Sequence, residues 1–184
     1  MYNVALEVVN LKNTVLLASM VVAAGSLYAQ APSDPLSAGT KATFDMVKNY
    51  VTRAAEKMPE ENYSFQPTPE VRTFARLVGH IADANYAFCS AVLGEKNPAP
   101  GIEKNKTSKA DLVAGLKDAF TYCDKAYDGM TDAHAAEIVK FFGREQAKLA
   151  VLAFNTAHTD EHYGNIVTYM RIKGLVPPSS EKRR

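Results

Sequence analysis

Three of the four histidines in this 184-residue chain are spaced in a way that suits a metal ion. His158 and His162 are four residues apart in a stretch of helical character, so their imidazoles share one helix face. His80 lies in a second helical stretch, about 11 residues from the expected start of that stretch. The midpoint between His158 and His162 lies about 15 residues from the start of their own stretch. All three rings can therefore meet near the middle of a helical bundle.

Imidazole is the commonest metal-ligating side chain, and three such ligands leave a coordination position open for water or substrate. We therefore predict that His80, His158 and His162 bind one divalent metal, whose water could attack an ester or amide bond. The alternative is that these are surface or hydrogen-bonded histidines. His134 lies in the loop-like segment TDAHAAE, and we expect it to be solvated.

Hydrolysis also needs a general acid or base near the metal-bound water. The candidates are Asp83, three residues after His80, and Glu161, which directly precedes His162. Either carboxylate could instead orient an imidazole, the role we favour for Asp83, whereas Glu161 is expected to face solvent. The chain contains neither the GxSxG pattern of serine hydrolases nor a glycine-rich phosphate loop. Tyr169 and Asn165 are interpreted as core and hydrogen-bonding residues.

The composition is that of an ordinary globular domain, with 47% hydrophobic and 22% charged residues. A net charge of +1 gives no basic excess, so a nucleic-acid partner is not expected. Two cysteines are too few for a disulfide-dense scaffold. No apolar run reaches the roughly 20 residues of a membrane-spanning helix, so no membrane contact is expected for the mature chain.

Four stretches show helical spacing of apolar residues, and no segment shows the alternation typical of strands. The fold class predicted is therefore all-α, a four-helix bundle. Thr68-Pro69-Glu70 is expected to begin the second helix, Ser108 with Asp111 the third, and the fourth is expected to run from about Glu145 to Lys173. The first three apolar seams comprise Phe44, Val47, Val51, Ala54 and Met58; Phe74, Leu77, Ile81, Ala84, Phe88 and Ala91; and Leu112, Leu116, Ala119, Cys123, Ala126 and Met130.

Residues 1–29 have the pattern of a secretory signal peptide. The apolar run TVLLASMVVAA, residues 14–24, follows Lys12 and precedes the small-residue segment that ends at Ala29. We expect cleavage after Ala29, which leaves residues 30–184 as one exported domain, periplasmic or extracellular. Because the positive n-region is weak, the true start could lie downstream of Met1. A buried N-terminal helix is the alternative interpretation.

The segments LVGHIADANYAFC (77–89) and HTDEHYGNIVTYMRIKGLVPPS (158–179) resemble the DinB-like superfamily of metal-binding four-helix bundles. The resemblance implies one metal-ligating histidine from the second helix and an HxxxH pair from the fourth, which His80, His158 and His162 match. It also implies zinc or nickel as the metal and a homodimer. Some members of the superfamily are thiol-dependent transferases or isomerases and others are presumed hydrolases.

An exported chain is separated from the cytoplasmic thiols that such transferases use, so a metal-dependent hydrolase with a small-molecule substrate is the function expected. The alternatives are a non-catalytic metal- or ligand-binding bundle, for example in envelope stress, and a DinB-type transferase. The resemblance also suggests an up-down-down-up bundle with a long crossover between helices two and three. The polar linker at residues 94–106 is long enough for this crossover. Parallel helices would allow a Cys89–Cys123 disulfide, and two buried free thiols are the alternative.

Overall fold

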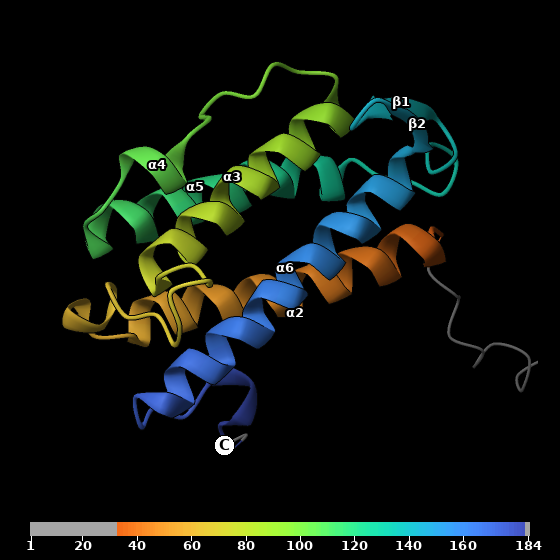
Figure 1. Ribbon diagram of the computed structural model, residues 1–184. Helices are drawn as coiled ribbons and strands as arrows, with labels where there is room; N and C mark the ends of the chain where they lie inside the picture. The colour runs from red at the N-terminus through yellow and green to blue at the C-terminus, as the bar shows by residue number, and fades with distance from the viewer. Residues whose placement is uncertain (1–32, 183–184) are drawn as a thin grey trace, which may run out of the picture. The chain divides into compact units, whose positions relative to one another are not determined.

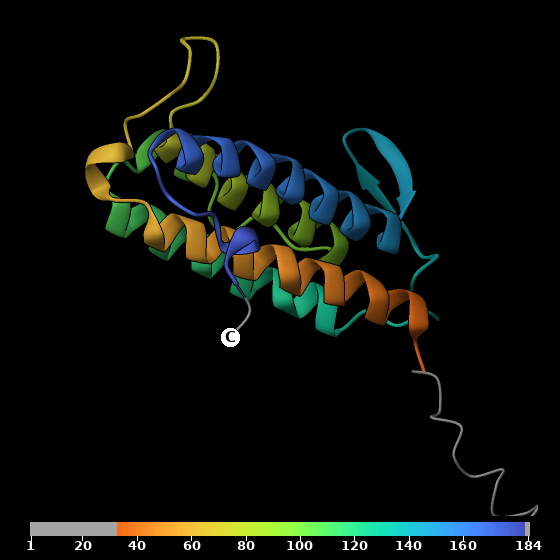
Figure 2. The ribbon, with the colours of Figure 1, turned by 90° about the horizontal axis from the view of Figure 1, so that it is seen from below.

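The computed structural model describes residues 33–182, and these form a mostly helical body (Figure 1; Figure 2 shows it from below). The predicted signal peptide, residues 1–29, and the expected start of the mature chain at Gln30 lie outside the described residues. Within the described part, no helix combines the length and the apolar character needed to cross a membrane.

The long helices are α2 (Pro35–Lys57), α3 (Phe74–Leu93), α5 (Lys109–Asp128) and α6 (Lys148–Ile172). Shorter elements are α4 (Ile102–Asn105), the 3-10 turns η2 (Glu60–Asn62) and η3 (Pro178–Ser180), and a hairpin of β1 (Ile138–Phe141) and β2 (Arg144–Ala147).

The apolar seams form the core because each places one face of its helix toward the neighbouring helices. Phe44 and Val51 of α2, Ile81 of α3 and Leu116 of α5 are completely buried. Of the residues assigned to the first three seams, Ala84 and Ala91 are the two that are only partly buried. From α6, Val151 and Ile166 complete the core.

Helices α3 and α5 lie side by side and run in the same direction, opposite to α2 and α6 (Figure 1). The segment that joins them returns along the body and includes α4. Cys89 and Cys123 form a disulfide between the two helices, with 5.3 Å between their Cα atoms. Cys89 comes 15 residues after the first residue of α3 and Cys123 comes 14 after that of α5, so parallel helices place them at one level.

The start of the second helix differs from the prediction. Helix α3 begins at Phe74, after Thr73, whose side chain accepts a hydrogen bond from the amide of Arg76. The preceding segment is fixed by backbone pairs instead, in which the amides of Phe74 and Ala75 donate to the carbonyls of Phe65 and Tyr63. These pairs satisfy first-turn amides, so a non-helical segment extends from Thr68 to Thr73.

The β-hairpin was not expected from the sequence. Helix α6 begins at Lys148 instead of Glu145, because residues 144–147 pair with residues 138–141 in an antiparallel ladder. Phe142 and Gly143 form the two-residue turn, and both have positive φ, at 48° and 75°. Phe141 anchors the hairpin, since its ring packs against that of Phe88 on α3, with 4.5 Å between the ring centroids.

Candidate metal centre

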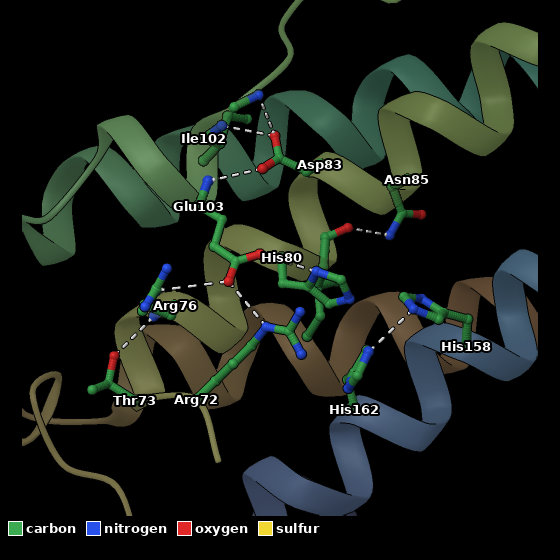
Figure 3. A network of polar contacts seen from close by, with 12 residues as sticks. Arg72, Thr73, Arg76, His80, Asp83, Asn85, Ile102, Glu103, His158 and His162 are labelled. Atoms are coloured by element: carbon green, nitrogen blue, oxygen red, sulfur yellow. Dashed lines mark hydrogen bonds and ion pairs between the residues drawn. The ribbon is translucent and has the colours of Figure 1, made fainter. Parts of the chain in front are cut away.

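The structure brings His80, His158 and His162 together between α3 and α6 (Figure 3). One ring nitrogen from each lies within 4.8 Å of the others. The Nε2 atoms of His158 and His162 are 3.1 Å apart. Two metal–nitrogen bonds of about 2.0–2.1 Å would span this separation at an angle of about 100°, close to tetrahedral. The pair on α6 therefore matches the spacing of two ligands of one metal, and His80 lies in the same cluster.

Burial keeps the paired imidazoles on α6 neutral. Burial, then the imidazoles of His158 and His80, lowers the pKa of His162 to about 4. The pKa of His158 is also lowered, first by burial and then by His80, although the nearby Glu161 acts in the opposite direction. A metal ligand must be an unprotonated imidazole, so these two rings are in the ligating form at neutral pH.

His80 is oriented by Glu103, which comes from α4. The Nδ1 atom of His80 lies 3.1 Å from Oε2 of Glu103. An ionised carboxylate only accepts hydrogen bonds, so Nδ1 carries the proton and donates. The lone pair of His80 is therefore on Nε2, which remains available to a metal. This carboxylate–imidazole pair is the arrangement that commonly fixes the tautomer of a metal-ligating histidine.

Asp83 attaches the α4 segment to α3. Its Oδ1 accepts hydrogen bonds from the amides of Gly101 and Ile102, at 2.9 and 2.7 Å, and its Oδ2 accepts from the amide of Glu103 at 2.9 Å. Gly79 allows this close approach, because a Cβ there would lie 2.6 Å from the Cα of Glu103. Asp83 therefore acts on His80 through the backbone that carries Glu103.

Two arginines surround the other oxygen of Glu103. Nε of Arg72 is 3.0 Å and Nε of Arg76 is 3.8 Å from Oε1. The backbone of Arg72 is itself held, since its carbonyl accepts a 2.7 Å hydrogen bond from the Tyr169 hydroxyl. Arg72 also disfavours protonation of His158 and His162, and so contributes to their lowered pKa values.

The imidazoles of His158 and His162 have weaker hydrogen-bond partners than the imidazole of His80. Nδ1 of His162 lies 3.5 Å from the side-chain amide of Asn165. Nδ1 of His158 is buried and has no hydrogen-bond partner among the described residues. The ring of His158 packs beside Phe88, with 5.8 Å between centroids. The carboxylate-bound His80 is consequently the ligand with the most defined orientation.

The candidate acids are placed differently from one another. Asp83 faces the α4 segment, where three amides occupy its carboxylate, and it makes no direct contact with an imidazole. Glu161 is exposed on α6. His134 lies in a turn away from the cluster, where its Nδ1 is 3.2 Å from the Thr131 hydroxyl. Tyr169 lies in the core and holds the backbone of Arg72.

Sequence reasoning missed Glu103 and Arg72. Both lie in segments between long helices, where apolar periodicity carries no information about direction. A weak signal was present for Glu103, because the preceding residue of the polar linker, Ile102, is a large apolar residue that packs in the core. Arg72 had no such signal, since the helix was expected to have begun before it.

Comparison with known proteins identifies the fold. A family model described as the DinB superfamily matches residues 43–166. The uncharacterised protein YjoA of Bacillus subtilis (strain 168) is 27% identical over 133 residues, which cover 69% of this chain and 84% of YjoA. The crystal structure of a DinB-like protein from Bacillus cereus ATCC 10987 superposes with a TM-score of 0.68 at 22% identity, over 76% of this chain and 94% of that one. The crystal structure of YjoA superposes with a TM-score of 0.63 at 22% identity, over 79% of this chain and 99% of YjoA.

Proposed function

The chain belongs to the DinB superfamily, and we propose that it is an exported metal-dependent hydrolase of a small-molecule substrate. The observation that carries the proposal is the convergence of the imidazoles of His80, His158 and His162, with ligand atoms within 4.8 Å of one another. Three neutral ligands from two helices leave one side of a metal open. An open position distinguishes a catalytic site from a closed structural one.

Zinc or nickel is the metal we propose, because imidazole ligands suit both ions. Such an ion, when bound, lowers the pKa of coordinated water to about 7 and polarises a substrate carbonyl. His158 and His162 would bind it through Nε2, as would His80, whose Nδ1 donates to Glu103. Glu103 keeps the His80 ring in the ligating tautomer and orientation.

Among the described residues, two of the acids near the cluster are already engaged by other groups. Asp83 is committed to three backbone amides, and Glu103 to His80 and Arg72. Glu161, which precedes His162, is exposed on α6 and is the residue we propose for proton transfer with solvent. Its charge raises the pKa of His158, against the larger effect of burial.

Export is supported by the bridge between α3 and α5. Disulfides persist in oxidising compartments and are rare in the cytosol, and Cys89 is bonded to Cys123. Together with the apolar run at residues 14–24, the bridge supports secretion of the mature chain from residue 30. The same location separates the chain from cytoplasmic thiol cofactors and disfavours a transferase.

Metal analysis of the purified protein tests the proposal. We expect about one zinc or nickel ion per chain for the wild type and for His134→Ala, whose imidazole lies outside the cluster. The His158→Ala variant should lose stoichiometric metal, because two imidazoles bind far less tightly than three. Equal metal content in both variants would overturn the site. Metal-dependent hydrolysis in a panel of esters and amides supports the enzyme, whereas a metal-loaded protein inactive on the whole panel indicates the non-catalytic binding bundle.

A further inference from the structure

A divalent metal at the candidate centre would carry positive charge that the three imidazoles would not compensate. Its three ligands are neutral imidazoles, so the charge of a divalent ion is not balanced by them. Glu103, the carboxylate in contact with the cluster, is already shared by His80, Arg72 and Arg76. A negatively charged ligand beside the metal would restore the balance.

Arg72 is positioned to bind such a ligand. It pairs with Glu103 through Nε, at 3.0 Å, so the ion pair uses one of the three guanidinium nitrogens. Among the described residues, no acceptor contacts its two terminal amino groups, which point toward the imidazoles in Figure 3. Its charge also acts on His158, His162 and Tyr169. Terminal amino groups held in this way can donate to two oxygens of a carboxylate or phosphate.

Arg76 lies near the same carboxylate but is not placed in the same way. Its Nε is 3.8 Å from Glu103, and its side chain is 64% exposed, compared with 42% for Arg72. On the side of His158 where Phe88 packs, the contact is aromatic and offers no charged donor. The donors for an anion therefore lie on the side of Arg72.

We propose that Arg72 is a substrate-binding residue that receives an oxyanion of the substrate beside the metal, which makes the substrate class a small carboxylate- or phosphate-bearing molecule. This inference rests on the proposed metal centre. The guanidinium binds the oxyanion, Glu103 and Tyr169 fix the arginine, and the reacting bond of the same molecule lies over the three histidines.

Anion titration of the zinc-loaded protein tests the proposal, with acetate and inorganic phosphate as separate probes at constant ionic strength. Two-dimensional NMR gives the dissociation constants for the wild type, Arg72→Gln and the matched control Arg76→Gln. Each variant removes one positive charge and one partner of Glu103. We expect Arg72→Gln to weaken the preferred anion by about tenfold or more, and Arg76→Gln by less than about twofold.

The outcomes separate the two proposals. Failure of the wild type to bind either zinc or nickel overturns the metal centre itself. Zinc binding with equal anion affinity in both arginine variants, or with no anion binding in the wild type, overturns the role of Arg72 and leaves the metal centre standing. Tighter binding of acetate than phosphate assigns a carboxylate substrate, and the reverse assigns a phosphate ester. Zinc affinity and thermal unfolding of each variant, measured in parallel, show whether a loss arises from misfolding.

Discussion

Removal of the Glu103 carboxylate should weaken metal binding although Glu103 is not a ligand. In the Glu103→Ala variant, Nδ1 of His80 loses the acceptor 3.1 Å away that fixes its tautomer and ring orientation. Partners of this kind contribute about 10–100-fold to metal affinity, which is about 1.4–2.7 kcal/mol. A hydrogen bond to a charged group contributes about 1.5–3 kcal/mol, so the two estimates agree.

Competition with a chromophoric zinc chelator measures the effect. Glu103→Gln keeps an acceptor oxygen but loses the charge, so its affinity should fall between those of the wild type and Glu103→Ala. Glu161→Gln is the control, because it removes an exposed carboxylate beside the cluster without a contact to an imidazole; we expect a change below about twofold. A Glu103→Ala protein that binds zinc within about twofold of the wild type would refute the role of Glu103.

A double-mutant cycle with Asp83 sharpens the test. Oδ2 of Asp83 accepts a 2.9 Å hydrogen bond from the backbone amide of Glu103, and Asp83 has no direct contact with His80. If it acts only through Glu103, Asp83→Ala should lower zinc affinity in the wild type but scarcely at all in the Glu103→Ala background. Additive losses would show that Asp83 affects the metal by a separate route.

Three further outcomes are expected. Replacing both Cys89 and Cys123 with Ala should destabilise the fold by about 4 kcal/mol, since the bridge spans 34 residues; urea unfolding should show reductant sensitivity in the wild type and none in the variant. Gly143→Ala should lower the melting temperature by about 2–4 °C, because a residue with a Cβ is strained at the φ of 75° in the hairpin turn, and an unchanged or higher value would contradict this. In the metal-free protein the pKa of His162 is about 4, against about 6.5 unfolded. The unfolded state therefore binds the proton first, so stability falls as pH drops from about 6.5 to about 4; a His162→Gln variant should show a flatter urea-midpoint profile over this range.

Helical periodicity predicted most of the fold, because α2, α3 and α5 each bury one regular apolar face. The four-residue spacing of His158 and His162 likewise predicted their common face, and similar depth predicted that His80 would join them. Element starts were less predictable. The second helix was expected to begin at Thr68-Pro69-Glu70, but backbone pairs of Phe74 and Ala75 with the preceding loop delay its start to Phe74.

The β-hairpin was not predicted from the sequence, for a different reason. Its strands have four residues each, too few for alternation to stand out from chance. Its turn uses Phe142-Gly143 where the usual signal is Asn-Gly. The hairpin is stabilised by tertiary packing instead, since the ring of Phe141 lies against Phe88 of α3. Such a contact joins residues more than 50 positions apart and leaves no local trace in the sequence.

Some residues of the candidate centre could be predicted from sequence spacing, and others could not. The ligands lie on helices, whose regular geometry makes spacing readable, whereas Glu103 and Arg72 lie on connecting segments placed by long-range contacts. Those contacts tie α4 to α3 through Asp83, and the Cys89–Cys123 bridge ties α3 to α5 farther along the same helices. His80, Asp83 and Gly79 all belong to α3, so the contacts of α4 with this one helix set where Glu103 meets His80. The orientation of this candidate ligand is therefore a property of the α3–α4 pair, which explains why a residue outside the long helices bears on a site whose candidate ligands all lie within them.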